Sequence, residues 1–103
     1  MTPPEDDFWE AIERIRDREP RFRREAYPFL VAALGATVMA LPAARREDPE
    51  RRHLSGSELV AGMIRFARAE FGPLAATVFE EWGVRTAGDV GDMVFLLIEE
   101  RQL

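Results

Sequence analysis

The run from Phe29 to Leu41 (FLVAALGATVMAL) limits how this chain can fold more than any other feature, because it holds thirteen residues without a charge. It is too short to cross a lipid bilayer, which takes about 20 apolar residues. Apolar side chains recur at helical spacing on a wide face that begins upstream of the run; they are Phe22, Ala26, Phe29 or Leu30, Ala33, Leu34, Val38 and Leu41. We therefore predict a central helix from about Arg23 to Leu41, in which Gly35 would let another helix pack closely.

The same run stands between elements of a secretory signal, since Arg23-Arg24 precede it and Pro42-Ala43-Ala44 follow it. Secretory signals start near the N-terminus, however, whereas this run comes after an acidic segment of 20 residues that has a helical pattern of its own. A buried helix is the favoured interpretation. We expect a cytoplasmic protein that does not bind membranes.

Another amphipathic helix is predicted over residues 5–18 (EDDFWEAIERIRDR). Its apolar face consists of Phe8, Trp9, Ile12 and Ile15, and Pro20 ends the pattern. We expect the aromatic pair Phe8-Trp9 to contribute to the core rather than to bind a ligand.

A third helix is predicted to start at Ser55, because Ser55 and Glu58 form the S-x-x-E pattern of a capping box. Leu54 and Leu59 occupy the two positions of a hydrophobic staple around this cap. Gly72 is the expected end of the helix.

Two further helices complete the predicted fold. One covers Pro73–Trp82 and ends at Gly83. The last begins after Thr86, whose T-x-x-D spacing to Asp89 is that of an N-cap. Its apolar residues are Val90, Met93, Val94, Leu97 and Ile98, and its stretch Phe95–Ile98 is the one place where a short strand is an alternative.

The segment 42–53 (PAARREDPERRH) lacks apolar periodicity and contains two prolines, so we predict an exposed charged loop. Pro28 falls in the first turns of the central helix, where it should kink the helix or delay its start. The chain as a whole, residues 1–103, is predicted to be a single compact all-α domain of about five helices.

Composition excludes several kinds of site. The chain has no cysteine, which removes disulfides, thiolate zinc sites and cysteine nucleophiles. Its single histidine, His53, cannot form a multi-imidazole metal site, and no loop has the ligand spacing of an EF-hand. We therefore expect no metal and no other cofactor.

Charge is distributed unevenly along the chain, whose net charge is −5. Residues 1–20 carry seven acids and three arginines (net −4), residues 21–53 carry seven arginines and four acids (net +3), and residues 54–103 carry four arginines and eight acids (net −4). Pairing between the basic middle and its acidic flanks is the simplest explanation. Nonspecific binding of nucleic acid over the whole surface is not expected.

The stretch Arg51–Leu59 (RRHLSGSEL) places the histidine beside Ser55 and Ser57, which raises the alternative of a nucleophilic site. No G-x-S-x-G turn accompanies these residues, and capping already explains Ser55. Paired carboxylates also occur, at Glu80-Glu81, Asp89 with Asp92, and Glu99-Glu100. They lie off the apolar faces, as solvated side chains do, so we predict no catalytic residue and no enzymatic activity.

Arg51, Arg52, His53 and Ser57 are the candidate residues for binding an anion or a partner. They lie at the predicted N-terminus of the third helix, where backbone amides attract anions and Gly56 would allow close approach. The cap formed by Ser55 and Glu58 competes for the same amides, so a structural role is favoured for those two residues.

Several blocks of residues together form a recognisable pattern over residues 8–98. They are Phe8-Trp9 with Ile12 and Ile15; Pro20-Arg21-Phe22 and Glu25-Ala26-Tyr27 with Phe29; His53-Leu54-Ser55-Gly56 with Glu58-Leu59 and Gly62; and Ala67, Phe71-Gly72-Pro73-Leu74-Ala75, Val78, Trp82-Gly83-Val84, Asp89, Gly91, Val94-Phe95 and Leu97. This pattern resembles the Minf-type family of small uncharacterised bacterial proteins. The resemblance implies no activity and carries over no functional residue. Arg23, in place of an aspartate, and Pro28 depart from the family's pattern at the start of the central helix.

The sequence thus favours a protein that acts by binding. A small helical domain with two tryptophans and 14 arginines suits a protein-interaction or self-associating module, because Trp and Arg are enriched at interface hot spots. The expected partner is another protein or a second copy of the chain. The alternative is an RNA-, ribosome- or phosphate-ligand-binding protein that uses the basic segment 45–57.

Overall fold

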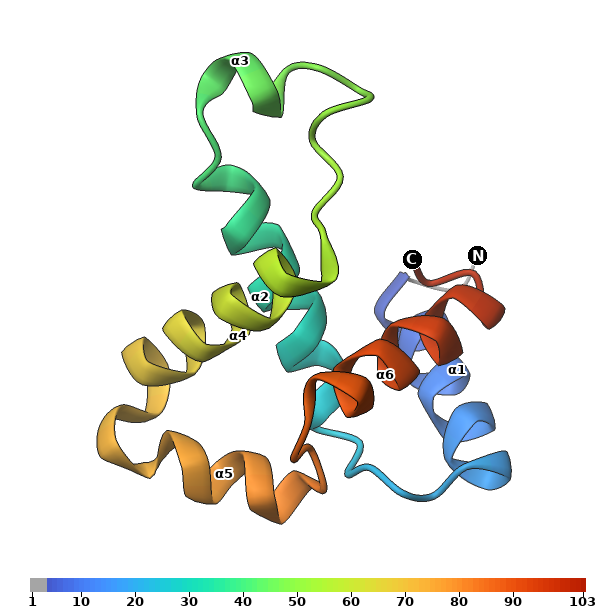
Figure 1. Ribbon diagram of the computed structural model, residues 1–103. Coiled ribbons are helices and arrows are strands. Elements are labelled where there is room, and N and C mark those ends of the chain that lie inside the picture. Colours follow the sequence, from blue (N-terminus) through green and yellow to red (C-terminus); the bar gives the residue numbers. More distant parts are fainter. Residues whose placement is uncertain (1–3) are drawn as a thin grey trace.

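The computed structural model describes residues 4–103, with side chains from Asp7 onward, and this part of the chain is helical without any strand (Figure 1). In chain order the elements are α1 (Pro4–Arg18), α2 (Ala26–Met39), α3 (Ala43–Arg46), α4 (Gly56–Phe71), the 3-10 turn η1 (Gly72–Leu74), α5 (Ala75–Trp82) and α6 (Ala87–Glu99). The predicted all-α domain with five main helices is confirmed, and Phe95–Ile98 is helical. The one-turn helix α3 lies inside the segment that was predicted to be a loop.

Helix α2 is central, as predicted, and α4 packs across it. It begins at Ala26 rather than near Arg23, so that Pro28 lies in its first turn, where its missing N–H has no helical partner to lose. Ala26, Tyr27, Phe29, Leu30, Ala33 and Thr37 are its buried residues. The delayed start that Pro28 predicted is therefore confirmed.

The close contact between α2 and α4 occurs at Thr37 and Gly62. A Cβ atom built on Gly62 would lie 2.0 Å from Thr37 Oγ1, which donates a hydrogen bond to the Ala33 carbonyl at 2.7 Å. The prediction that Gly35 would serve this purpose is wrong, because no atom lies within 4 Å of a Cβ built there. Gly35 faces away from α4, and the glycine that permits close packing belongs to the other helix.

Five aromatic rings join α2 to the α4–α5 corner. Phe29 lies at their centre, with ring centroids between 5.2 and 5.8 Å from those of the other four, which are Phe66, Phe71, Phe79 and Trp82. The prediction that Trp9 contributes to the core is wrong, because 43% of Trp9 is exposed. The buried face of α1 is centred on Ala11 and Ile15, so Trp9 falls at its edge.

Ion pairs hold α6 beside α1. Arg14 and Arg18 bind the Glu100 carboxylate at 2.7 and 2.8 Å, and Arg21 pairs with Asp89 and with Asp92. The first pairs bring the two acidic flanks of the chain together, and the Arg21 pairs join the basic middle to the C-terminal flank. The expected internal pairing of the charged segments is confirmed for Arg21.

Short motifs set the ends of α4, α5 and α6 as predicted. Ser55 and Glu58 form a complete capping box, and so do Thr86 and Asp89. Gly83 ends α5 with φ 82°, and a Cβ there would lie 2.7 Å from the Arg21 carbonyl oxygen. A glycine is therefore required at this position for two independent reasons.

The chain between α2 and α4, residues 40–54, forms an arm that projects from the body with α3 at its tip (Figure 1). The radius of gyration is 14.0 Å, against about 13 Å for a typical compact domain of this length. The protein is thus more open than a typical domain of its size.

The Gly62 contact predicts a strong and position-specific effect of an added methyl group. Gly62→Ala should lower the free energy of unfolding by about 1–3 kcal/mol, because Thr37 cannot move away without displacing α2. Gly35→Ala is the matched control; it should raise stability by about 0.5–1 kcal/mol through reduced chain entropy. Urea denaturation of both variants measures this, and equal effects would contradict the assignment of the contact.

Tyr27 supplies a second stability prediction. Its hydroxyl is buried without a hydrogen-bond partner in the described structure, and burial, followed by the nearby Glu19 charge, raises its pKa to about 12. Tyr27→Phe should therefore leave the free energy of unfolding unchanged or raise it by about 1 kcal/mol. Because the folded pKa exceeds the unfolded value near 10, stability should be intact below pH 10 and should fall as pH rises towards 12.

Tyr27 is the only tyrosine in the chain, so tyrosinate absorbance reports on it alone. We expect no tyrosinate signal near pH 10 in the folded protein. Tyr27→Phe should remove the loss of stability that ionisation of Tyr27 causes between pH 10 and pH 12. A midpoint near 10 with the protein still folded would show that the hydroxyl is solvated.

Candidate functional site

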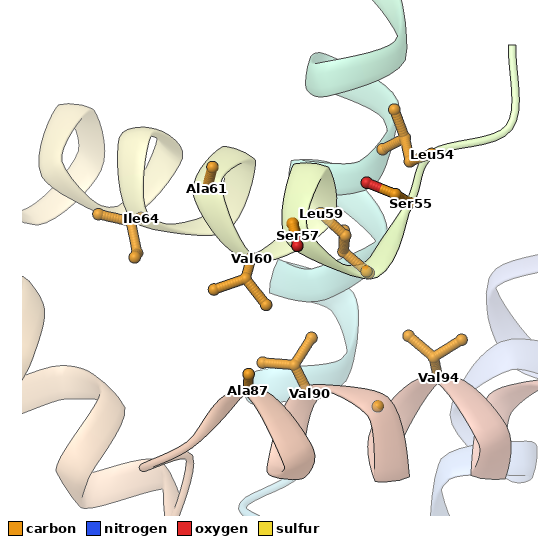
Figure 2. Close-up of a pocket in the computed structure, with 12 residues that line it drawn as sticks. Leu54, Ser55, Ser57, Leu59, Val60, Ala61, Ile64, Ala87, Val90 and Val94 are labelled. Carbon is orange, nitrogen blue, oxygen red and sulfur yellow. The ribbon is translucent and has the colours of Figure 1, made fainter.

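An apolar groove lies between α4 and α6, with a volume of about 700 Å³ (Figure 2). Its lining residues are Leu54, Ser55, Gly56, Ser57, Leu59, Val60, Ala61, Ile64, Ala87, Val90, Gly91 and Val94. Val60 and Val90 project towards each other from the two helices, and the segment from Leu54 to Leu59 lies at one end. Among residues 7–103, no charged side chain lines this groove.

A smaller cavity of about 170 Å³ continues the groove towards the end of α5. The two share Val60, Ile64, Ala87 and Val90. Arg85, in the turn before α6, is the one charged residue among the described residues that line either cavity. The combined surface is therefore apolar, with a cation at one end.

Helix α6 has three faces that differ in chemistry. Val90, Met93 and Leu97 are buried in the core, and the acidic residues lie on the flank that faces α1. The third flank is uncharged, and by helical spacing it contains Ala87, Gly91, Val94, Phe95 and Ile98. Phe95 is 62% exposed and Ile98 51%, so apolar surface continues from the groove onto the outside of α6.

The polar end of the groove is the N-terminus of α4. The Glu58 N–H donates to Ser55 Oγ at 3.1 Å, and the Ser55 N–H donates to the Glu58 carboxylate at 2.9 Å. The guanidinium of Arg45, together with the Ser55 N–H, lowers the pKa of Glu58 to about 2. A carboxylate thus already occupies the place where an anion would approach the helix.

Arg45 organises the segment 42–53. Its Nε donates to the Arg51 carbonyl at 2.6 Å, and its Nη2 donates to the His53 carbonyl at 3.0 Å and to Glu58 at 2.8 Å. The prediction of a simple exposed loop is therefore wrong in part, because the segment contains α3 and folds around this one side chain. Its exposed charged character is otherwise retained.

The predicted binding residues do not form a single binding site. Arg51, Arg52, His53 and Ser57 are all exposed, and Ser57 lines the groove. The side chains of Arg51, Arg52 and His53 make no hydrogen bond or ion pair with any residue from 7 to 103. The structural cap predicted for Ser55 and Glu58 is confirmed.

The nucleophilic alternative is not assembled in the described part of the chain. No hydrogen bond joins His53 to Ser55 or Ser57 there, and Ser55 Oγ accepts from the backbone. The carboxylate pairs on α6 bind arginines, and the pKa of Glu100 is lowered by Arg14 and Arg18. Among residues 7–103, no three metal-ligating side chains come together.

Sequence reasoning missed Arg45 and the walls of the groove. Nothing local connects Arg45 to Glu58, thirteen residues later. The sequence does contain a signal for the groove. Val60 and Ile64 lie off the Leu59–Met63 face of α4, and Phe95 and Ile98 lie off the Val90–Leu97 face of α6. Apolar residues beyond the core face of two neighbouring helices predict a second apolar surface.

In the described residues, no helix has both the length and the apolar character that crossing a membrane requires. No family model, no curated protein and no solved structure matches the chain.

The Arg45–Glu58 pair predicts how the arm responds to acid. Because the folded pKa of Glu58 is about 2, below its usual 4.5, the stability that this pair contributes should be complete above pH 4.5 and lost as pH falls towards 2. Arg45→Gln should raise the Glu58 pKa towards 4.5, while the Ser55 N–H keeps it somewhat low. Carboxyl NMR titration measures this shift.

Arg46→Gln is the matched control for that titration. Arg46 neighbours Arg45 on α3, but its guanidinium donates to the Met39 carbonyl instead of the carboxylate. The Glu58 pKa should therefore be unchanged in this variant. A similar shift in both variants would mean that general charge, rather than the direct contact, sets the pKa.

Proposed function

We propose that the protein is a protein-interaction module that receives the apolar face of a helix in the groove between α4 and α6. The observation that carries this proposal is the uncharged groove of about 700 Å³, which continues outward onto Phe95 and Ile98. Grooves between two helices are a recurring receptor for amphipathic helices. Contiguous exposed apolar surface on a soluble domain also marks interaction sites.

The distribution of polar groups favours a helix over a small molecule. Small-molecule sites usually combine an apolar cavity with several convergent polar groups that fix one orientation. Among the described residues, the polar side chains that line the groove are Ser55 and Ser57, and the smaller cavity adds Arg85 and Thr86 at the other end. A small ligand inside it would also leave Phe95 and Ile98 uncovered, whereas a helix lying along α6 would cover both.

Gly91→Arg tests the groove directly. No atom lies within 4 Å of a Cβ built on Gly91, so the new side chain fits the fold while it fills the groove. A helical peptide selected from a displayed library should shift NMR signals of Val60, Val90 and Val94, and Gly91→Arg should weaken its binding by at least about tenfold, or 1.4 kcal/mol.

Gly35→Arg is the control, because Gly35 is an equally open glycine within α2, outside the groove. This variant should bind the peptide as the parent does. Peptides that bind but shift signals elsewhere, or that tolerate Gly91→Arg, would sink the proposal.

The segment 45–57 supports a second candidate, an anionic partner such as RNA. Arg51, Arg52 and His53 are exposed without ion pairs in the described structure, although Arg45 is committed to Glu58. If this candidate holds, a single-stranded RNA oligonucleotide should bind with an affinity that falls steeply as salt rises. Arg51→Ala with Arg52→Ala should weaken binding and reduce the salt dependence.

Arg65→Ala with Arg68→Ala provides the matched control, since both arginines are exposed on α4 outside this segment. Binding that both double variants reduce equally would indicate general electrostatic attraction. Binding that does not respond to salt would exclude this candidate.

A further inference from the structure

We infer that the helix received by the groove between α4 and α6 carries an aspartate or glutamate side chain that lies over Arg85. The inference rests on the proposed function and adds the chemistry of the partner to it. Three arguments support it: the position of one cation at the end of an apolar surface, the pairing of the neighbouring carboxylates, and the cost of covering an unpaired charge.

Arg85 lies in the turn between α5 and α6, where the smaller cavity forms one end of the groove. Ile64 and Ala87, which line both cavities, mark this end of the groove (Figure 2). The backbone N–H of Arg85 donates to Asp89 Oδ2 at 2.8 Å, which holds the main chain of the turn in place. The guanidinium makes no ion pair or hydrogen bond with any residue from 7 to 103, and the residue is exposed. An unpaired cation is thus presented from a well-held turn.

The carboxylates of α5 and α6 leave this guanidinium unpaired in the described structure. Asp89 accepts from the backbone N–H groups of Arg85 and Thr86, and its carboxylate pairs with Arg21. Glu80 lines a separate cavity together with Arg85, but no ion pair joins the two side chains among the described residues. The charge at this end of the groove is therefore open to a partner.

A helix that fills the groove to this end also covers Arg85 and removes water from it. An arginine side chain is a donor only, so it loses free energy when it is covered by an apolar group that accepts no hydrogen bond. A lysine or arginine of the partner at this place would add repulsion. A carboxylate offsets the loss of water, because it accepts charge-assisted hydrogen bonds from the guanidinium.

The charges farther along α6 limit where the acid of the partner can lie. Asp92 and Glu99 are helical neighbours of Phe95 and border its exposed ring. Their side chains are 58% and 45% exposed, although each carboxylate pairs with an arginine. An acidic residue of the partner is therefore favoured over Arg85 and disfavoured over Phe95. This difference sets the register of a helix in a groove whose walls are otherwise apolar.

Selection from a displayed library of helical peptides tests the inference. The library keeps one apolar face and randomises the residues that flank it. Peptides that bind the full chain, and that lose binding to Gly91→Arg, should be enriched in Asp or Glu at one flanking position. The same library selected on Arg85→Glu should be enriched in Lys or Arg at that position.

Arg65→Glu is the matched control, because it changes the net charge by the same amount. Arg65 is exposed on α4 and lines a different cavity, together with Thr37 of α2. Selection on this variant should return the same acidic peptides as selection on the parent protein.

A charge exchange with one selected peptide measures the contact itself. Arg85→Glu should weaken binding of the acidic peptide by at least about tenfold, because like charges then face each other. Replacing the acid of the peptide with lysine should restore binding to this variant to within about threefold of the parent pair. Restored binding also shows that the variant is folded.

The outcomes separate this inference from the proposed function. Peptides that bind the groove without an acidic preference would overturn the inference and leave the proposed function intact. The same would follow if Arg85→Glu weakened binding equally for the acidic peptide and for its glutamine counterpart, because Arg85 would then contact main-chain carbonyls. If no peptide were sensitive to Gly91→Arg, both the inference and the proposed function would be overturned.

Discussion

The crossing of α4 over α2 is the contact on which the other parts of the structure depend. Helix α2 carries no charged residue, so its stability in water relies on neighbours that cover it. Gly62 lets α4 approach until Thr37 is buried, and Thr37 satisfies its own hydroxyl within α2. Once this crossing is made, Phe29 reaches the rings at the α4–α5 corner, and α5 can return the chain to place α6.

Helix α6 packs against both α4 and α1. Its core face packs inward and its acidic flank is held by arginines of α1 and of the following loop. Exposed ion pairs of this kind contribute little to stability, so burial of Val90, Met93 and Leu97 sets the rotation of α6 about its axis. That rotation keeps every carboxylate of α6 away from α4, and the groove is uncharged as a result.

Much of the fold could be predicted because its signals are local. The capping boxes at Ser55 and Thr86 are complete within four residues, and Gly83 needs only its own backbone conformation to end α5. The candidate site depends on long-range contacts. Gly35 and Gly62 are both mid-helix glycines, and only the neighbour across the crossing distinguishes them. Nothing in the sequence distinguishes Arg45 from the other arginines of the basic segment, because its contact with Glu58 forms only in the folded chain.

The dependence of the arm on Arg45 makes residues 40–54 a cooperative unit with its own opening equilibrium. One guanidinium holds two carbonyls of the arm and the capping carboxylate of α4, so these contacts form or break together. Local units of this kind open at free energies well below that of global unfolding. Because Leu54 at the end of the arm and the adjacent Ser55 both line the groove, opening the arm also reshapes one end of the groove. The order of a solvent-exposed loop and the shape of an apolar surface are thereby thermodynamically linked.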